Sequence, residues 1–156
     1  MIASIVGIWR YPRKGEPGEP MLNIDLLQGI GLKGDFPRGG KRQVSILAAE
    51  ARRWMDTQAE KGLCFRRFRE NLLVEGLALE ELGSGVLLSV GKAVLQITGY
   101  SKGCYDGCPL LLKNRSCRLA GCVCFADVVQ SGIVRLRDVV SIYSPLHMER
   151  GDSFDK

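Results

Sequence analysis

Histidine is almost absent from this chain of 156 residues, whose only imidazole belongs to His147 in the polar C-terminal stretch. Nucleophilic and general-base catalysis most often use an imidazole within hydrogen-bonding distance of the reacting group. A residue in a polar terminal stretch is usually exposed to solvent and lies away from any site. The sequence therefore argues against a thiol protease and against a mechanism that needs a histidine base.

Nucleotide-binding signatures are also lacking. No G-x-x-x-x-G-K-[ST] motif occurs, and no G-x-G-x-x-G motif leads from a predicted strand into a predicted helix. These motifs work because backbone amides at the start of a helix hold the phosphates. Without them, nucleotide-dependent catalysis has no support in the sequence.

Long hydrophobic runs are missing as well, and no positive charge precedes the apolar residues of the N-terminal MIASIVGIW. This run is too short for a secretion signal with a cleavage site, and far too short to span a bilayer. We therefore expect a cytoplasmic protein that contacts no membrane. Because thiols stay reduced in the cytosol, the six cysteines favour metal or sulfur chemistry over a disulfide framework.

Aromatic residues make up only 7% of the chain, whereas an excess of basic residues gives it a net charge of +5. The basic residues gather in three clusters, namely Arg38, Lys41 and Arg42; Arg52 and Arg53; and Arg66, Arg67 and Arg69. Such clusters could bind a small anion or a nucleic acid, or form a solvated face. Because the scattered aromatic residues offer no stacking platform, a nucleic-acid-binding barrel is the less favoured alternative.

Nineteen glycines separate short apolar runs, a pattern typical of strands and turns rather than of a helical bundle. It predicts strands at residues 2–9, 22–27, 42–47, 86–90, 93–98, 124–129, 133–136 and 139–143, and another within 72–82 before a turn at Gly76. Hairpins are expected across Gly91–Lys92 and Ser131–Gly132. Residues 10–20 are predicted to form a loop.

One helix is predicted at residues 48–61, where Trp54 and Met55 fall on its apolar face and Gly62 provides a stop. Many short strands with a single helix predict a mainly β fold, a β-barrel-like single domain with short helical decoration. The domain is expected to span residues 1–143, followed by a polar tail at 144–156.

Five of the six cysteines lie between Gly99 and Phe125. Cys104 follows Lys102 and Gly103, and a nearby cation favours the thiolate, which is both the nucleophile and the soft metal ligand. We therefore predict that Cys104 is a reactive thiol that carries sulfur or binds a metal, and that Cys108 assists it.

A zinc site is an alternative use of these cysteines. However, the spacing C-x3-C followed by C-x4-C-x-C, which runs from Cys104 to Cys124, matches structural zinc sites poorly. Cys122 and Cys124 lie two residues apart at the start of a predicted strand. They are expected to face the same side, as buried, small apolar residues.

Several motifs, taken in order, resemble the MOSC domain, named for the C-terminal domain of molybdenum cofactor sulfurases, and most closely its small stand-alone bacterial members. They are GLKGD (31–35), RQVSIL (42–47), FRENLLVEGLALEEL (68–82), VGKAVLQIT (90–98), KGCYDGC (102–108) and FADVVQSGIVRLRDVV (125–140). The resemblance implies a β-rich barrel that binds the molybdenum cofactor (molybdopterin), or carries sulfur for it. Relatives often have a histidine soon after GLKGD, where this chain has Phe36-Pro37-Arg38.

The resemblance also implies roles for particular residues. Cys104 matches the cysteine that ligates the metal, and Arg69 and Asn71 match positions that hold the pterin and its phosphate. The residues themselves fit a phosphate, because glycine backbone near cations suits an anion. The candidate cofactor-binding residues are Gly34, Asp35, Arg42, Arg69, Asn71 and Lys102.

Two questions stay open at the level of sequence. Arg69 could instead pair with a surface carboxylate, such as that of Glu70 or Glu75. The protein could also be a non-catalytic module that binds the pterin cofactor or a partner, such as a sulfur donor protein, without turnover.

Overall fold

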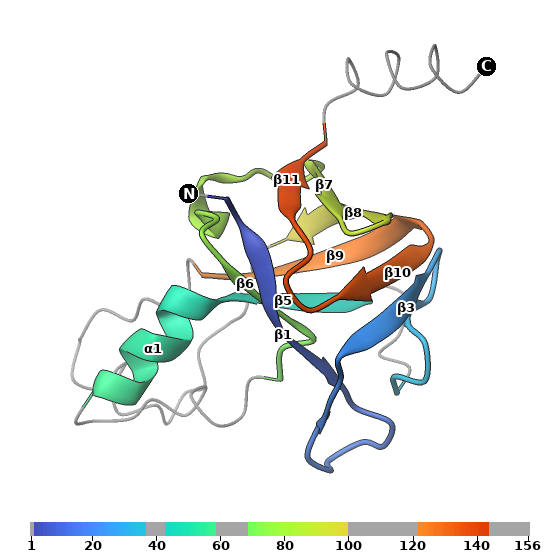
Figure 1. Cartoon of the computed structure of the whole chain (residues 1–156), viewed down its shortest axis with the longest axis horizontal. Helices are drawn as coiled ribbons and strands as arrows, with labels where there is room; N and C mark the ends of the chain where they lie inside the picture. Colours follow the sequence, from blue (N-terminus) through green and yellow to red (C-terminus); the bar gives the residue numbers. More distant parts are fainter. Residues whose placement is uncertain (1, 37–42, 59–68, 100–121, 144–156) are drawn as a thin grey trace.

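The computed structural model describes residues 2–36, 43–58, 69–99 and 122–143 of the chain, and strands dominate these residues (Figure 1). The strands are β1 (Ser4–Arg10), β2 (Glu19–Pro20), β3 (Asn23–Leu27), β4 (Gly31–Leu32), β5 (Val44–Ala48), β6 (Leu72–Glu75), β7 (Leu87–Val90), β8 (Ala93–Gly99), β9 (Val123–Gln130), β10 (Gly132–Arg135) and β11 (Val140–Ile142). One α-helix, α1 (Ala49–Thr57), and one 3-10 turn, η1 (Leu79–Glu81), accompany them. The predicted mainly β fold with one main helix is confirmed.

Eight strands form one sheet in the order β11-β7-β8-β9-β5-β6-β1-β2. β5 and β6 run parallel, joined through α1, whereas the other neighbouring pairs are antiparallel. The sheet curls strongly (Figure 1), so that β1 meets the residues before β11. There the Arg137 N–H donates to the Ile5 carbonyl at 2.7 Å, and the Val140 N–H donates to the Ala3 carbonyl at 2.9 Å. These bonds satisfy backbone groups of β1 and draw the two ends of the curled sheet together.

A second, three-stranded sheet has the order β10-β3-β4. In β3, Ile24 and Leu26 are buried while Asn23 and Asp25 are exposed, as the period of two in the sequence predicts. The predicted hairpin across Gly91 is confirmed between β7 and β8. The predicted hairpin across Gly132 is wrong, because β10 pairs with β3. Both edges of β9 are already occupied by β5 and β8, so β10 must find another partner.

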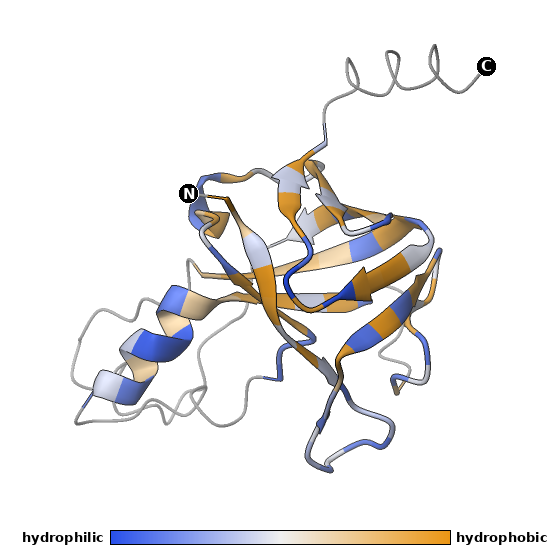
Figure 2. Ribbon diagram, viewed as in Figure 1, coloured by the Kyte–Doolittle hydropathy of each residue, from blue (hydrophilic) through white to orange (hydrophobic). Residues whose placement is uncertain are grey.

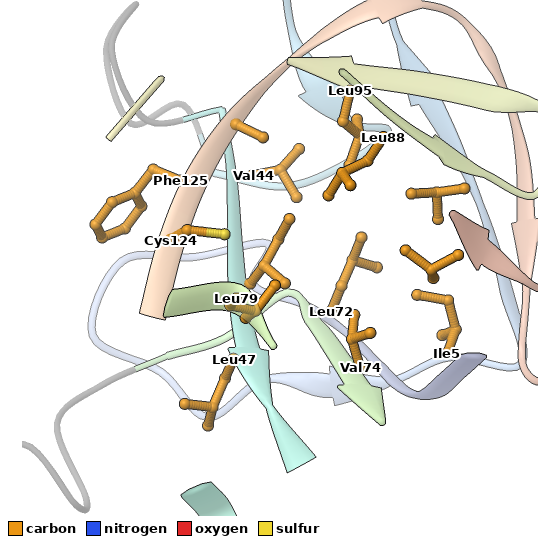
Figure 3. Close-up of a cluster of buried hydrophobic side chains, with 14 of the residues drawn as sticks. Ile5, Val44, Leu47, Leu72, Val74, Leu79, Leu88, Leu95, Cys124 and Phe125 are labelled. Atoms are coloured by element: carbon orange, nitrogen blue, oxygen red, sulfur yellow. The ribbon is translucent and has the colours of Figure 1, made fainter. Parts of the chain in front are cut away.

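The core lies inside the curled sheet, where apolar residues of the strands face one another (Figures 2 and 3). All of β5 is buried, in keeping with a strand that is apolar except at Ser45. Figure 3 shows the Cys124 side chain pointing into this cluster and Phe125 pointing to the other side of β9. Met55 on α1 is also buried, and Trp54 packs against the core, as predicted for that helical face.

The helix is shorter than predicted, because it ends at Thr57 and Gln58 already has an extended backbone. The Thr57 hydroxyl donates to the Trp54 carbonyl at 2.8 Å, and the Gln58 amide donates to the same oxygen at 3.4 Å. These side chains satisfy a carbonyl that the helix leaves free, so the helix can stop before Gly62. The sequence also missed β2, which lies within the predicted loop at residues 10–20.

Within the described residues, no helix is long and apolar enough to cross a membrane. The proposed tail at 144–156 lies outside the described residues.

Candidate functional site

Four of the predicted cofactor-binding residues lie together in the structure: Gly34, Asp35, Arg69 and Asn71. They gather where β1 ends and where β5 and β6 begin. The remaining candidates, Arg42, Lys102, Cys104 and Cys108, lie outside the described residues. The described part of the site is therefore the part that contains Arg69, Asp35 and Asn71, without the predicted sulfur residues.

Asn71 is the centre of this group, and its side chain is completely buried. Its Oδ1 accepts the Ser45 backbone N–H at 3.0 Å, and its Nδ2 donates to the Trp9 carbonyl at 3.2 Å and to Asp35 Oδ2 at 3.4 Å. The backbone also takes part, since the Asn71 N–H donates to the Ser45 carbonyl at 2.9 Å. Asn71 thus joins β1, β5 and the turn after β4 at one point.

Asp35 connects the turn after β4 to β1. Its Oδ1 accepts the Tyr11 backbone N–H at 2.7 Å, while its Oδ2 accepts from Asn71. Gly34, beside it, has a φ of +82°, and a Cβ there would lie 3.1 Å from the Arg10 side chain. A side chain at position 34 would therefore be strained in its backbone and crowded by Arg10, so this turn needs glycine.

Arg69 is exposed and its guanidinium lies over the Tyr11 ring, 5.7 Å from the centroid. Its Nη1 donates to the Glu16 carbonyl at 2.7 Å. The Tyr11 hydroxyl donates to the Glu70 carbonyl at 2.8 Å, which fixes the ring below the cation. The guanidinium is thus held on an aromatic face, and its other N–H groups have no hydrogen bond among the described residues.

The carboxylates that the sequence offered as partners for Arg69 are taken by other cations. Arg52 Nη2 lies 2.7 Å from Glu70 Oε1, and Arg53 Nη2 lies 3.5 Å from Glu75 Oε1. None of the ion pairs formed between described residues includes Arg69. The alternative of a surface pair with Glu70 or Glu75 is therefore wrong, and Arg69 keeps an uncompensated charge within this part of the chain.

Sequence reasoning missed two members of the group, Tyr11 and Ser45. The Ser45 hydroxyl donates to the Arg69 carbonyl at 2.8 Å and lies 1% exposed within the buried strand β5. A single polar residue inside an otherwise apolar strand was a signal for it, because a buried hydroxyl needs a partner. Tyr11 had no such signal, since the loop that follows β1 gave no pattern.

The cysteines at the start of β9 have a different environment. Cys122 and Cys124 are both buried, as predicted. Burial raises the pKa of the Cys124 thiol from 9.0 to about 12, because the apolar core disfavours the thiolate. Cys124 is therefore a packing residue that stays protonated at neutral pH.

The chain is similar to known proteins over most of its length. A family model for the MOSC domain matches residues 33–141. No curated protein sequence matches the chain significantly. The crystal structure of the YuaD protein from Bacillus subtilis is 20% identical and covers 92% of this chain and 97% of its own, with a TM-score of 0.70.

Two further crystal structures are similar. That of YiiM from Escherichia coli is 21% identical, with a TM-score of 0.61, and covers 92% of this chain and 70% of its own. That of YiiM from Geobacillus stearothermophilus is 16% identical, with a TM-score of 0.58, and covers 92% and 74%. At such identities the likeness establishes a shared fold.

Proposed function

Because this chain belongs to the MOSC domain family, which is generally associated with the molybdenum cofactor, we propose that it binds molybdopterin through Arg69. The observation that carries the proposal is the state of this residue. Arg69 is exposed, stacked on Tyr11, and outside every ion pair formed between described residues. A guanidinium held in this way can grip a phosphate with two parallel hydrogen bonds.

The described residues fit the anionic end of this cofactor. Arg69 supplies the charge, and the turn at Gly34 presents backbone without a side chain. Asp35, another of the predicted cofactor-binding residues, has each of its carboxylate oxygens engaged by a donor, the Tyr11 N–H and the Asn71 amide. Both oxygens of Asp35 are thus bound to protein donors, so within this group Arg69 is the residue that would bind the phosphate.

The sulfur chemistry in this proposal belongs to Cys104 and Cys108, which lie outside the described residues. When bound, the cofactor supplies a molybdenum centre with sulfur ligands. Cys104 would provide a thiolate to that metal or carry sulfur for it, and Cys108 would assist. Lys102 and Arg42 would add positive charge near the anionic pterin. A sulfur donor protein is the partner that such a role requires.

The experiment compares Arg69→Ala with the parent protein, purified under reducing conditions from cells that make the cofactor. We expect molybdenum and pterin to copurify with the parent and binding of a phosphate-bearing pterin to weaken by about 1.5–3 kcal/mol in the variant, the worth of a hydrogen bond to a charged group. Arg53→Ala is the matched control, since Arg53 is an exposed arginine that pairs with Glu75. Equal binding by the parent and Arg69→Ala, or a parent that holds no molybdenum and no pterin, would remove the proposal.

A further inference from the structure

We propose that Asn71 is a positioning residue, which together with Asp35 and Ser45 fixes Arg69 for its anion and does not itself contact the ligand. This inference rests on the proposed function, because it assigns separate tasks to two residues of the same FREN motif. We call the three residues Asp35, Ser45 and Asn71 the polar bracket.

Asn71 has no free N–H to offer an anion. A primary amide has two N–H donors, and the Trp9 carbonyl and Asp35 Oδ2 take both. Its oxygen accepts the Ser45 N–H at 3.0 Å and lies 3.1 Å from the Ser45 hydroxyl. The side chain is also 0% exposed, so a ligand could reach it only by displacing the protein around it.

The orientation of the amide follows from its neighbours. A backbone N–H can only donate, so the atom facing Ser45 N–H must be the oxygen. A backbone carbonyl can only accept, so the atom facing Trp9 O must be the nitrogen. With the amide reversed, both contacts would oppose like groups in a buried place. The bonding of Asn71 is therefore unambiguous.

The polar bracket contacts Arg69 through the Arg69 backbone. The Asn71 N–H is shared between the Ser45 carbonyl at 2.9 Å and the Ser45 hydroxyl at 3.0 Å, and this hydroxyl donates to the Arg69 carbonyl at 2.8 Å. The Ser45 hydroxyl thus links the backbones of Asn71 and Arg69, on either side of Glu70. This fixes the point from which the Arg69 side chain leaves the backbone.

A second path from the polar bracket leads to the ring beneath the guanidinium. Asp35, which accepts from Asn71, also accepts the Tyr11 N–H at 2.7 Å. The Tyr11 hydroxyl is bound to the Glu70 carbonyl, and a Cβ on Gly18 would lie 2.5 Å from the ring. Tyr11 is therefore fixed by hydrogen bonds at its backbone and its hydroxyl, and the Gly18 backbone lies close to its ring.

Both paths lead from Asn71 to Arg69, one through the backbone of Arg69 and one through its stacking partner. A long side chain such as arginine loses rotamer freedom when it binds an anion, and a prearranged one loses less. The polar bracket would raise the affinity for the anion by this route. Asn71 is therefore expected to affect anion binding only while Arg69 is present.

This dependence gives a double-mutant test with inorganic phosphate as the probe, titrated against the whole chain. Arg69→Ala is expected to weaken binding about tenfold or more, and Asn71→Ala severalfold. In the Arg69→Ala background, the Asn71 substitution should have no further effect, because its target is gone. Additive losses would mean that Asn71 contacts the anion directly, which would overturn the proposal.

Tyr11→Phe is a milder variant for the case in which Asn71→Ala does not fold. It removes only the hydroxyl bonded to Glu70 and keeps the ring. We expect severalfold weaker phosphate binding with Arg69 present and no change with Arg69→Ala. Arg53→Ala, whose arginine pairs with Glu75, serves as the control that should bind as the parent does.

A measurement without ligand separates this inference from the proposed function. If the parent binds no phosphate, the anion site fails, but the position of Arg69 can still be read from the NMR signal of its guanidinium Nε–H. In the parent this signal should stand apart from those of solvated arginines. In Tyr11→Phe and Asn71→Ala it should move towards them. An Arg69 signal that is unchanged in these variants would refute the positioning role.

Discussion

Two described regions of this molecule, the residues before β6 and the start of β9, place polar and reactive side chains in opposite environments. At the start of β6, the charge of Arg69 is exposed and the amide of Asn71 below it is buried but fully hydrogen-bonded. At the start of β9, the Cys124 thiol lies in an apolar core, which raises its pKa to about 12. The charged group of Arg69 is thus accessible to a ligand, whereas the thiol of Cys124 is buried and protonated.

The difference arises from what each strand packs against. β9 lies between β5 and β8, so the side chains on its inner face meet only the core. The residues before β6 face the end of β1 and the turn after β4, where backbone groups need partners. Burial with partners makes a rigid support, whereas burial without them makes an inert side chain.

The largest expected difference between the two regions is in thiol reactivity. At pH 7, a pKa of about 12 leaves roughly one Cys124 thiol in 10⁵ ionised, against a few per cent for an ordinary cysteine. Cys104, predicted to lie beside Lys102, should therefore be alkylated at least about 10³-fold faster than Cys124 in the folded protein. Peptide mapping after a brief iodoacetamide treatment measures both rates. Faster labelling of Cys124 would contradict the assignment of Cys104 as the sulfur site.

The next largest effect is on stability, when the centre of the polar bracket is removed. Asn71→Ala removes the hydrogen bonds that the buried amide makes with the Ser45 N–H and the Trp9 carbonyl, so we expect a loss of about 2–4 kcal/mol in the free energy of unfolding. Asn23→Ala is the matched control, because Asn23 is exposed on β3 and should change stability by less than about 0.5 kcal/mol. Urea denaturation compares the two, and equal losses would show that the hydrogen bonds of the Asn71 side chain do not stabilise the fold.

The pH dependence of stability tests the buried thiol. Its pKa is about 12 in the folded protein and 9.0 when exposed, so the unfolded chain loses the proton first as the pH rises. The folded state then binds more protons than the unfolded state, and stability falls between these two values, by at most about 1.4 kcal/mol per pH unit. The full contribution of this thiol is present below pH 9. Denaturation of the parent and of Cys124→Ala from pH 8 to pH 10.5 measures it, and the variant should show the shallower decline.

Local pattern predicted much of the fold. The alternation in β3 can be read from five consecutive residues. The turn between β7 and β8 is likewise local, since it depends on Gly91, which has a φ of +56°. The partner of β10 is a different matter. Its pairing with β3 depends on β9 having both edges filled, and that is settled by strands far away in the sequence.

The candidate site shows the same limit. Arg69 and Asn71 were found because they stand together in one motif, but their tasks could not be told apart. The contacts of Asn71 join residues that are 26, 36 and 62 positions away, so no local pattern could contain them. Sequence can thus point to a polar pair, whereas the division into a cation at the surface and a buried support comes from long-range contacts.

The smallest expected effect on stability comes from Arg69→Ala. Arg69 joins no ion pair formed between described residues, and its bond to the Glu16 carbonyl is exposed. The variant should therefore unfold within about 1 kcal/mol of the parent, as surface substitutions do. The contrast with Asn71→Ala, two residues further on, is the measurement that matters, because Asn71 is expected to support both the fold and the position of Arg69, whereas Arg69 is expected to matter for binding alone. Urea denaturation of both variants makes the comparison. If Arg69→Ala lost as much stability as Asn71→Ala, Arg69 would be a residue that stabilises the fold. Its assignment as the anion-binding cation would then lose its basis.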